Sequence, residues 1–212
     1  MAVFLTNFLV LAAGEASRFG SPKQLAELQG DTLLQLAERR VETLAQRLHE
    51  SGDESKSYLV LGANREKIYS AVDAQKWTDL VVCENWKEGM AASIYAGLSH
   101  CLSRKSLLNQ TQQGTLILLL DQPVLNDSDL VRFLLNAIQK NCMYASAYPD
   151  SIGPPVYFPK QSMNDFMRWY ESGGRRPKKF LGEHDVKVGK VGGVQQDVDT
   201  PADLANLDRP VV

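Results

Sequence analysis

The stretch "LVLAAGEASRFGSPKQL", which runs from Leu9 to Leu25, changes abruptly from apolar residues to a loop that contains glycine, proline, arginine and lysine. The apolar part has the composition of a strand covered on both faces, and the loop has neither helical nor strand periodicity. A loop of this kind after a strand is either an ordinary connection to a helix or a binding site for phosphate groups. The remainder of the sequence has to decide between these two interpretations.

Two common phosphate-binding loops do not fit this stretch. The dinucleotide fingerprint G-x-G-x-x-G needs closely spaced glycines so that the backbone can turn onto the pyrophosphate, but Gly14 and Gly20 are six residues apart. A Walker A loop needs lysine directly after its last glycine, but Gly20 is followed by Ser-Pro-Lys. The interpretation that remains is a longer loop whose backbone N–H groups wrap a nucleoside triphosphate, with Arg18 and Lys23 neutralising its oxygens.

The composition fits one globular domain over residues 1–212, because a chain of 212 residues with 44% hydrophobic content can bury a continuous core. The formal net charge of -2 at pH 7 gives no global attraction to nucleic acid or to an anionic membrane surface, so we expect neither partner. The three cysteines, Cys83, Cys101 and Cys142, have no CxxC spacing, which favours reduced thiols over a disulfide framework or a zinc site. No stretch approaches the roughly 18 apolar residues of a membrane span, and the apolar start lacks the basic region of a signal peptide. We therefore expect a soluble cytoplasmic protein.

Strand patterns and helical patterns alternate along the chain. Short, nearly continuous apolar runs predict strands at residues 7–12, 57–62, 79–83, 115–120 and 144–148. Apolar residues at three- and four-residue spacing after Asp31, a suitable N-cap, predict a long helix over residues 33–48. Further helices are predicted at residues 65–72, 90–102, 129–140 and 161–170, and from Pro201 onward, with polar loops at 51–57 and 103–114. This alternation predicts an α/β fold with a mainly parallel sheet and helices on both faces.

The opening loop and four later segments resemble one known family. "LAAGEASRFGSPKQL", residues 11–25, resembles the signature of the nucleotidyltransferases of the molybdenum cofactor family, a branch of the sugar-nucleotide transferase superfamily. The later segments follow in the family's order and extend the resemblance over nearly the whole chain. They are "LVLGANREKI" (59–68), "ENWKEGMAASIYAGL" (84–98), "LLLDQPVL" (118–125) and "DVDTPADL" (197–204). The resemblance implies a three-layer, Rossmann-like nucleotidyltransferase fold with a mainly parallel mixed sheet.

Asp121 stands where a buried apolar run ends, and a carboxylate there is costly unless it is paired, hydrogen-bonded or bound to metal. The carboxyl ends of strands are also where open α/β sheets bind ligands. The resemblance implies that Asp121 and Asp199 hold Mg²⁺, with Asp197 as a supporting ligand or as a contact for the pterin or phosphate. The sequence around Asp199 also fits the start of a helix, with Asp199 or Thr200 as the capping residue.

The resemblance also implies a reaction. A terminal phosphate of Mo-molybdopterin attacks the α-phosphorus of CTP, pyrophosphate leaves, and the cytosine dinucleotide form of the cofactor results. Arg18, Lys23 and Asp121 take the catalytic roles, the two cations by stabilising charge on the phosphate oxygens. The residues expected to bind the nucleotide are Leu11, Ala12, Ala13, Gly14, Arg18, Lys23, Gly89, Ser93 and Asp121.

Three features of the sequence bear on specificity. Guanylyltransferases of the resembling family have a second glycine where this chain has Ala13, so we expect CTP to be preferred over GTP. The basic run "SGGRRPKKFL" at residues 172–181 offers Arg175 and Arg176 as contacts for the anionic pterin phosphate, although exposed charge runs are more often solvated surface. "GPPVYFP" at residues 153–159 departs from the GHP or GNP element that relatives carry, which is expected near the pterin.

Other functions remain open from the sequence. A nucleotidyltransferase of this kind could use GTP, or could transfer to a different phosphorylated acceptor such as a sugar phosphate. A noncatalytic carrier or chaperone could instead hold the cofactor for an acceptor molybdoenzyme of the xanthine dehydrogenase type. The expected cations and carboxylates are all present, so we expect an enzyme whose partners are CTP, Mo-molybdopterin and such a molybdoenzyme.

Overall fold

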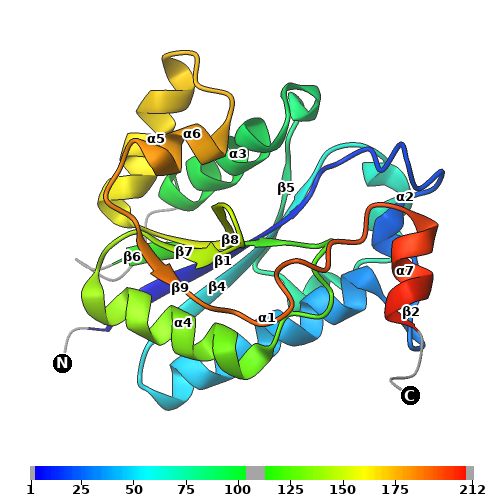
Figure 1. Ribbon diagram of the computed structural model, residues 1–212, viewed down its shortest axis with the longest axis horizontal. Helices are drawn as coiled ribbons and strands as arrows, with labels where there is room; N and C mark the ends of the chain where they lie inside the picture. Colours follow the sequence, from blue (N-terminus) through cyan, green and yellow to red (C-terminus); the bar gives the residue numbers. More distant parts are fainter. Residues whose placement is uncertain (1–2, 104–112, 209–212) are drawn as a thin grey trace.

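A seven-stranded mixed sheet runs through the centre of the molecule and is covered by helices on both faces (Figure 1). The structure is a computed structural model that describes residues 3–103 and 113–208. Across the sheet the strands are β5 (Asp79–Val82), β4 (Glu54–Leu61), β1 (Leu5–Ala12), β6 (Gln113–Leu119), β8 (Ile152–Pro159), β7 (Tyr144–Ala147) and β9 (Lys187–Gly189). Strand β8 is antiparallel to β6 and β7, and the other neighbouring pairs are parallel. The α/β fold with a mainly parallel mixed sheet that the sequence predicts is confirmed.

The helices lie in two layers and at one end of the sheet (Figure 1). One face carries α1 (Leu33–Glu50) and α4 (Asp127–Lys140), and the other carries α3 (Met90–Ser103), α5 (Lys160–Glu171) and α6 (Pro177–Gly182). The short helices α2 (Arg65–Tyr69) and α7 (Pro201–Leu207) lie near the carboxyl end of β1. The remaining elements are the 3-10 helices η1 (Lys23–Leu25), η2 (Ala74–Lys76) and η3 (Trp86–Glu88), and the hairpin strands β2 (Glu27–Leu28) and β3 (Asp31–Thr32). Within the described ranges, no helix is both long and apolar enough to cross a membrane.

Strand β1 is the centre of this architecture, because it pairs in parallel with β4 on one side and β6 on the other. Its buried side chains alternate between the two faces of the sheet. Phe8 and Val10 pack into the core beneath α1 and α4, whereas Leu9 and Leu11 pack into the core beneath α3 and α5. After β1 the chain first forms β4 on one side of β1 and later forms β6 on the other side. The loop after β1 therefore lies at the crevice where such sheets bind ligands.

The N-terminus of α1 differs from the prediction, because Thr32 rather than Asp31 caps the helix. The Thr32 hydroxyl accepts a hydrogen bond from the Gln35 N–H at 3.1 Å, and Gln35 Oε1 accepts one from the Thr32 N–H at 2.8 Å. Asp31 forms a bidentate ion pair with Arg39 instead. Threonine followed three residues later by glutamine is the capping-box pattern, which satisfies two backbone donors where aspartate alone would satisfy one.

Strand β8 is not predicted from the sequence. Prolines usually argue against a strand because they cannot donate to the sheet, and this strand contains Pro154 and Pro155 close to its first residue, Ile152. They lie between Gly153, which pairs with β7, and Val156, which pairs with both neighbours. The pairing with β7 shifts register at this point, so the missing N–H groups fall at an irregularity in the sheet.

Helix α6 is also not predicted, and it forms part of the basic run at residues 172–181. Pro177 occupies its first turn, where the missing N–H has no helical partner to lose. Phe180 and Leu181 are buried, so this run is anchored to the core, while its four charged side chains are exposed. Most of the loop predicted at 103–114 lies outside the described residues, and the last two residues of that loop belong to β6.

Glu38 lies on the buried side of α1 although it carries a carboxylate. It is 7% exposed and accepts a hydrogen bond from the Trp77 indole N–H at 3.1 Å. Burial raises the pKa of Glu38, and the hydrogen bond from Trp77 offsets part of that rise. A carboxyl whose pKa is raised by folding stabilises the fold at low pH and loses this contribution as the pH rises through the folded-state pKa. Ionised Glu38 therefore lowers stability at neutral pH.

We expect Glu38→Gln to raise the melting temperature at pH 7, because the amide keeps an acceptor for Trp77 and removes the buried charge. The difference from the wild type should shrink as the pH falls toward about 4, where the carboxyl is increasingly protonated. Thermal unfolding followed by circular dichroism between pH 4 and pH 8 measures both effects. Glu42→Gln, on the same helix where Glu42 pairs with Lys76 at the surface, is the matched control and should show no such gain. A lower melting temperature for Glu38→Gln at pH 7 would contradict the prediction.

Candidate active site

The loop after β1, the end of β6 and the segment before α7 meet in one pocket of about 260 Å³ at the carboxyl edge of the sheet. Seven residues that the sequence analysis selects line this pocket. They are Leu11, Ala12, Gly14, Arg18, Lys23, Asp121 and Asp199. The fold therefore brings together three segments that are far apart in the chain.

The backbone of the loop after β1 presents unused donors. Within the described chain, the N–H groups of residues 14–18 donate to no backbone or side-chain acceptor. Ala16 has φ of 55°, and its carbonyl accepts from the Phe19 N–H at 2.9 Å, which curves the loop. Gly20 follows with φ of 79°, a conformation that glycine adopts without steric cost. Unpaired N–H groups along a curved loop are an arrangement that binds phosphate oxygens.

Lys23 opens η1, and its ammonium is turned into the pocket. The Nζ atom donates to Asp121 Oδ2 at 2.7 Å, to Val198 O at 3.1 Å and to Asp199 Oδ1 at 3.4 Å. The side chain is 12% exposed. All three N–H donors of the ammonium therefore have an oxygen acceptor, and Lys23 joins the end of β6 to the segment before α7.

Asp199 contacts both predicted cations. Its Oδ2 pairs with Arg18 Nη2 at 2.8 Å, while Oδ1 faces Lys23. Arg18 is 69% exposed, so this outer pair is screened by solvent. Helix α7 does not use Asp199 as its cap, because the Thr200 hydroxyl accepts from the Asp203 N–H and the Asp203 carboxylate accepts from the Thr200 N–H. The Asp199 carboxylate is thus available to the pocket.

Asp121 has one paired and one unpaired carboxylate oxygen. Oδ2 accepts from Lys23, whereas Oδ1 is buried with no hydrogen-bond partner in the described chain. A buried oxygen without a partner is costly unless a ligand supplies one. The carboxylates of Asp121 and Asp199 are the hard ligands that Mg²⁺ prefers alongside phosphates and water. No group of three or more His, Cys, Asp or Glu side chains suited to a metal occurs within residues 3–103 and 113–208, so substrate oxygens would complete such a site.

Asp197 lies beside these carboxylates and is held by Gln122. The fully buried Gln122 donates through Nε2 to Asp197 Oδ1 at 2.9 Å and to the Tyr148 hydroxyl at 2.7 Å. Partial burial raises the pKa of Asp197, the hydrogen bond from Gln122 lowers it, and the neighbouring carboxylates of Asp121 and Asp199 raise it. Asp197 therefore lies within electrostatic range of Asp121 and Asp199, although the three do not form a group that could hold one metal ion together.

Gln24 is a buried residue of the pocket that the sequence analysis misses. It is 1% exposed, and its Nε2 donates to Ala12 O at 2.8 Å and to Gly14 O at 3.4 Å. This side chain fixes the backbone on both sides of Ala13, where β1 becomes the loop. A hydrogen bond from a side chain to a backbone carbonyl produces no periodic pattern in the sequence. The position of Gln24 next to Lys23 is the one feature of the sequence that indicates a role in the pocket.

Arg40 on α1 is a second missed residue, and it holds the segment that follows Asp121. Arg40 is 8% exposed, and its Nε donates to Asp127 Oδ1 at 2.9 Å. Its terminal nitrogens donate to three backbone carbonyls, those of Gln122 at 3.2 Å, Pro123 at 2.8 Å and Leu125 at 3.4 Å. The forked guanidinium lets one cation serve four acceptors. Arg40 therefore positions the backbone beside Asp121 from outside the pocket.

Three predicted nucleotide contacts do not line this pocket. Ala13 is 3% exposed and packs against Gly62, where an added β-carbon would lie 2.8 Å from the Ala13 carbonyl oxygen. Gly89 precedes α3 with φ of 97°. Ser93 is buried on α3 and hydrogen-bonds the thiol of Cys83. The structure thus keeps these three residues apart from the wall that Lys23 and Asp121 form.

The basic run forms the rim of a separate cleft of about 380 Å³. Five buried apolar residues form much of its wall, namely Ile94, Ile117, Val156, Phe158 and Leu181. Arg175 is engaged within the protein, because its Nε pairs with Glu88 at 3.0 Å and its guanidinium lies 4.4 Å from the centre of the Tyr170 ring. Arg176 and Lys178 are exposed at the rim, and among the described residues neither pairs with a carboxylate. These two cations are the ones available to an anionic ligand.

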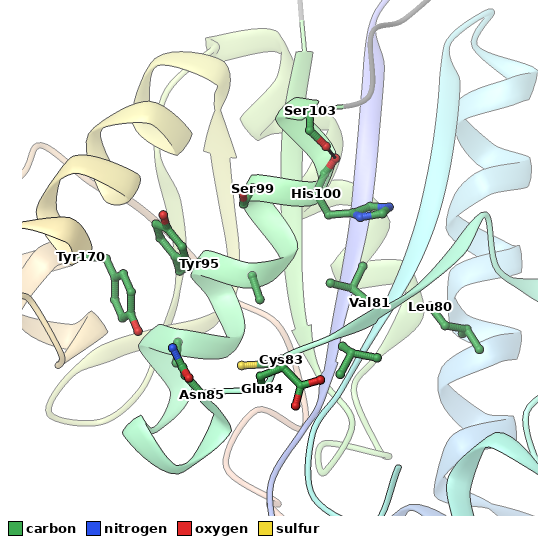
Figure 2. A pocket seen from close by; sticks show the side chains of 13 residues that line it. Leu80, Val81, Cys83, Glu84, Asn85, Tyr95, Ser99, His100, Ser103 and Tyr170 are labelled. Carbon is green, nitrogen blue, oxygen red and sulfur yellow. Dashed lines mark hydrogen bonds between the residues drawn. The ribbon is translucent and has the colours of Figure 1, made fainter. Parts of the chain in front are cut away.

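Figure 2 shows another cleft, of about 470 Å³, between edge strand β5 and α3. Tyr95 and Tyr170 stack on one side with ring centres 4.5 Å apart, and His100 on the other side pairs with Asp79 at 3.0 Å. Neither Lys23 nor either of the proposed metal ligands is among the residues that line it. Its greater volume does not make it the better candidate, because the donors suited to a triphosphate are in the smaller pocket.

Comparisons with known sequences and structures bear on the family and the fold of the chain. The sequence model of the MobA-like NTP transferase domain matches residues 8–188. A comparison with curated proteins gives no match.

Several solved structures share the fold. Rv0371c from Mycobacterium tuberculosis H37Rv is 27% identical with a TM-score of 0.73, over 98% of this chain and 99% of that chain. A manganese complex of Rv0371c is 23% identical with a TM-score of 0.67, over 97% and 98%. Molybdopterin-guanine dinucleotide biosynthesis protein A from Archaeoglobus fulgidus is 18% identical with a TM-score of 0.68, over 95% and 96%. The 4-diphosphocytidyl-2C-methyl-D-erythritol synthase from Anaerococcus prevotii is 16% identical with a TM-score of 0.70, over 97% and 95%.

We expect Arg40→Ala to lower the free energy of unfolding by roughly 3 kcal/mol, because it leaves a carboxylate and three carbonyls without their buried donor. For a chain of this size the melting temperature should fall by about 6–12 °C. Arg40→Lys should recover only part of the loss, because an ammonium lacks the fork. Differential scanning calorimetry measures these shifts. Arg39→Ala, which removes only the exposed pair with Asp31, is the control, and equal melting temperatures for the two alanine variants would show that Arg40 does not hold this segment.

Proposed function

Because the chain belongs to the MobA-like NTP transferase family, a family of nucleotidyltransferases, we propose that it transfers CMP from CTP to the terminal phosphate of Mo-molybdopterin. The products are pyrophosphate and the cytosine dinucleotide form of the cofactor. The observation that carries the proposal is the position of Lys23, whose ammonium faces Asp121 and Asp199 beside a loop with unpaired N–H groups. This combination suits a triphosphate, which needs donors and positive charge on one side and carboxylates for a metal ion on the other.

In the proposed reaction the protein orients two phosphates and stabilises charge. An oxygen of the acceptor phosphate forms a bond to the α-phosphorus as the bond to pyrophosphate breaks, so no nucleophile from the protein is needed. The N–H groups of residues 14–18 hold the triphosphate in place. Arg18 and Lys23 stabilise the charge that develops on its oxygens.

The unpaired Oδ1 of Asp121 fits a role in binding Mg²⁺. When bound by Asp121 and Asp199, the ion would neutralise charge on the α-phosphate. The manganese complex of Rv0371c shows that a protein of this fold holds a divalent ion, which supports the proposal for this chain.

The preference for CTP is assigned to Ala13, acting through the backbone. Its methyl group is buried against Gly62, and the adjacent carbonyls of Ala12 and Gly14 are held by Gln24. Ala13 therefore sets the path of the loop rather than touching the base. One structural relative is named for a cytidyl product and another for a guanine dinucleotide, so the shared fold does not by itself select the base.

We assign the binding of the acceptor, Mo-molybdopterin, to the cleft of about 380 Å³ whose rim is the basic run. Arg176 and Lys178 lie at its rim, where they can pair with an anionic group. The apolar wall suits the faces of a planar ring. A sugar phosphate is the second candidate acceptor, but its hydroxyl groups would lose hydrogen bonds against this wall. The dinucleotide product would pass to a cytoplasmic molybdoenzyme of the xanthine dehydrogenase type.

We expect the purified protein to release pyrophosphate and form the cytosine dinucleotide when it is incubated with Mo-molybdopterin, Mg²⁺ and CTP. GTP should be at least about tenfold less effective, which corresponds to roughly 1.4 kcal/mol of discrimination. Chromatography of the nucleotide products and a pyrophosphate assay measure both reactions. Product from GTP alone would identify a guanylyltransferase, and product only with a sugar phosphate would identify a different acceptor. Tight cofactor binding without turnover of either nucleotide would identify a carrier and overturn the proposal.

We expect Lys23→Ala and Asp121→Ala to lower kcat/KM for CTP by at least about a hundredfold, because each removes a group that acts on the triphosphate. Both variants should keep the circular dichroism spectrum of the wild type. Lys67→Ala is the matched control, because Lys67 is an exposed lysine of α2 that does not line the pocket. Near-normal turnover in either pocket variant would remove that residue from the mechanism.

A further inference from the structure

Lys23 occupies the position of a cation between the two carboxylates that are proposed to bind metal. Its ammonium lies 2.7 Å from Asp121 Oδ2 and 3.4 Å from Asp199 Oδ1, and its third donor reaches Val198 O at 3.1 Å. These oxygens come from two segments, so the ammonium is bound much as a small metal ion would be. The side chain is 12% exposed and is thus held mainly by these contacts.

Each of the two carboxylates proposed to bind metal is paired with a cation in the free protein, and the nearby Asp197 is held by Gln122. Asp121 and Asp199 carry two negative charges, and Lys23 and Arg18 pair with them directly. A divalent ion that approached both carboxylates would therefore meet an ammonium already in contact with them. Like charges at such short range repel strongly in a partly buried site.

Lys23 and Arg18 differ in their exposure and in the number of carboxylates that each contacts. Arg18 is 69% exposed and touches only the outer oxygen of Asp199. Lys23 is the cation that bridges both carboxylates, and its flexible stem allows the ammonium to move to another acceptor. A triphosphate bound to the N–H groups of residues 14–18 would offer such acceptors within the same pocket.

We propose that Lys23 and the divalent ion are alternative occupants of the Asp121 and Asp199 pair. The free protein binds metal weakly, because the ammonium fills the cation position. Metal binds tightly only together with the nucleotide, whose phosphates accept the ammonium and so release the carboxylates. This inference rests on the proposed nucleotidyl transfer, and it adds an order of binding in which metal enters as its nucleotide complex.

The test is a titration of the full-length protein with Mn²⁺, followed by the electron paramagnetic resonance signal of the free ion. Without nucleotide, Lys23→Met should bind Mn²⁺ at least tenfold more tightly than the wild type. Lys23→Arg, which keeps the positive charge, should remain as weak as the wild type. The double variant Lys23→Met with Asp121→Asn should lose the gain, and Lys67→Met is the control for the removal of an exposed lysine.

A second titration uses α,β-methylene CTP, which cannot release pyrophosphate. The wild type should bind Mn²⁺ tightly in its presence, and the gain from Lys23→Met should become small. Tight Mn²⁺ binding by the wild type without nucleotide would contradict the proposal that Lys23 and the metal ion are alternative occupants, whether or not the Lys23→Met variant folds. Equal Mn²⁺ affinity of folded Lys23→Met and wild type would overturn it as well.

The outcomes separate this inference from the proposed function. If metal binds the free wild type tightly while CTP is still turned over, only the proposal of alternative occupants is wrong, and the proposed function stands. If neither CTP nor GTP binds or reacts, the proposed function is wrong, and the effect of Lys23 on Mn²⁺ affinity is decided by the nucleotide-free titrations alone.

Discussion

The contact of the Lys23 ammonium with Asp121 and Asp199 is the constraint on which the candidate site depends. A lysine that is largely removed from solvent needs acceptors on all its donors, and these acceptors come from the ends of segments widely separated in the chain. Each segment is also fixed by a contact of its own. Gln24 holds the loop after β1, Arg40 holds the chain after Asp121, and the capping box of α7 fixes the segment that carries Asp199. The cation therefore meets carboxylates whose positions are set by the fold around them.

The sequence predicts the parts of this arrangement that have local signals. Continuous apolar runs identify β1 and β6, and the residues at their carboxyl ends follow from the rule that α/β sheets bind ligands there. This rule predicts Lys23 and Asp121 at one edge, the family resemblance adds Asp199, and the three residues line one pocket. The same reasoning cannot tell which residues near the loop face inward. Ala13 and Ser93 are buried in the core instead, because alternation along β1 and the helical period of α3 direct them there.

The parts that escape prediction depend on contacts between distant residues. Arg40 donates to carbonyls more than 80 positions away, and such bonds to the backbone require no particular residue type in the partner. Strand β8 escapes prediction because its prolines are tolerated only where the pairing with β7 is irregular. The cap of α1 is Thr32 rather than the predicted Asp31, because Thr32 has a partner for a capping box in Gln35, three positions later. Tertiary context decides each of these cases.

In the proposed function, a nucleotide and a divalent ion bind together at the carboxyl edge of the sheet around Lys23. The most direct measurement is a crystal structure of the protein with α,β-methylene CTP and Mn²⁺, in which anomalous scattering locates the metal. We expect an anomalous peak bound by Asp121 and Asp199, with the triphosphate on the loop of residues 14–18 and the Lys23 ammonium on a phosphate oxygen. Triphosphate bound in the cleft between β5 and α3, with Lys23 still paired to Asp121, would contradict this expectation.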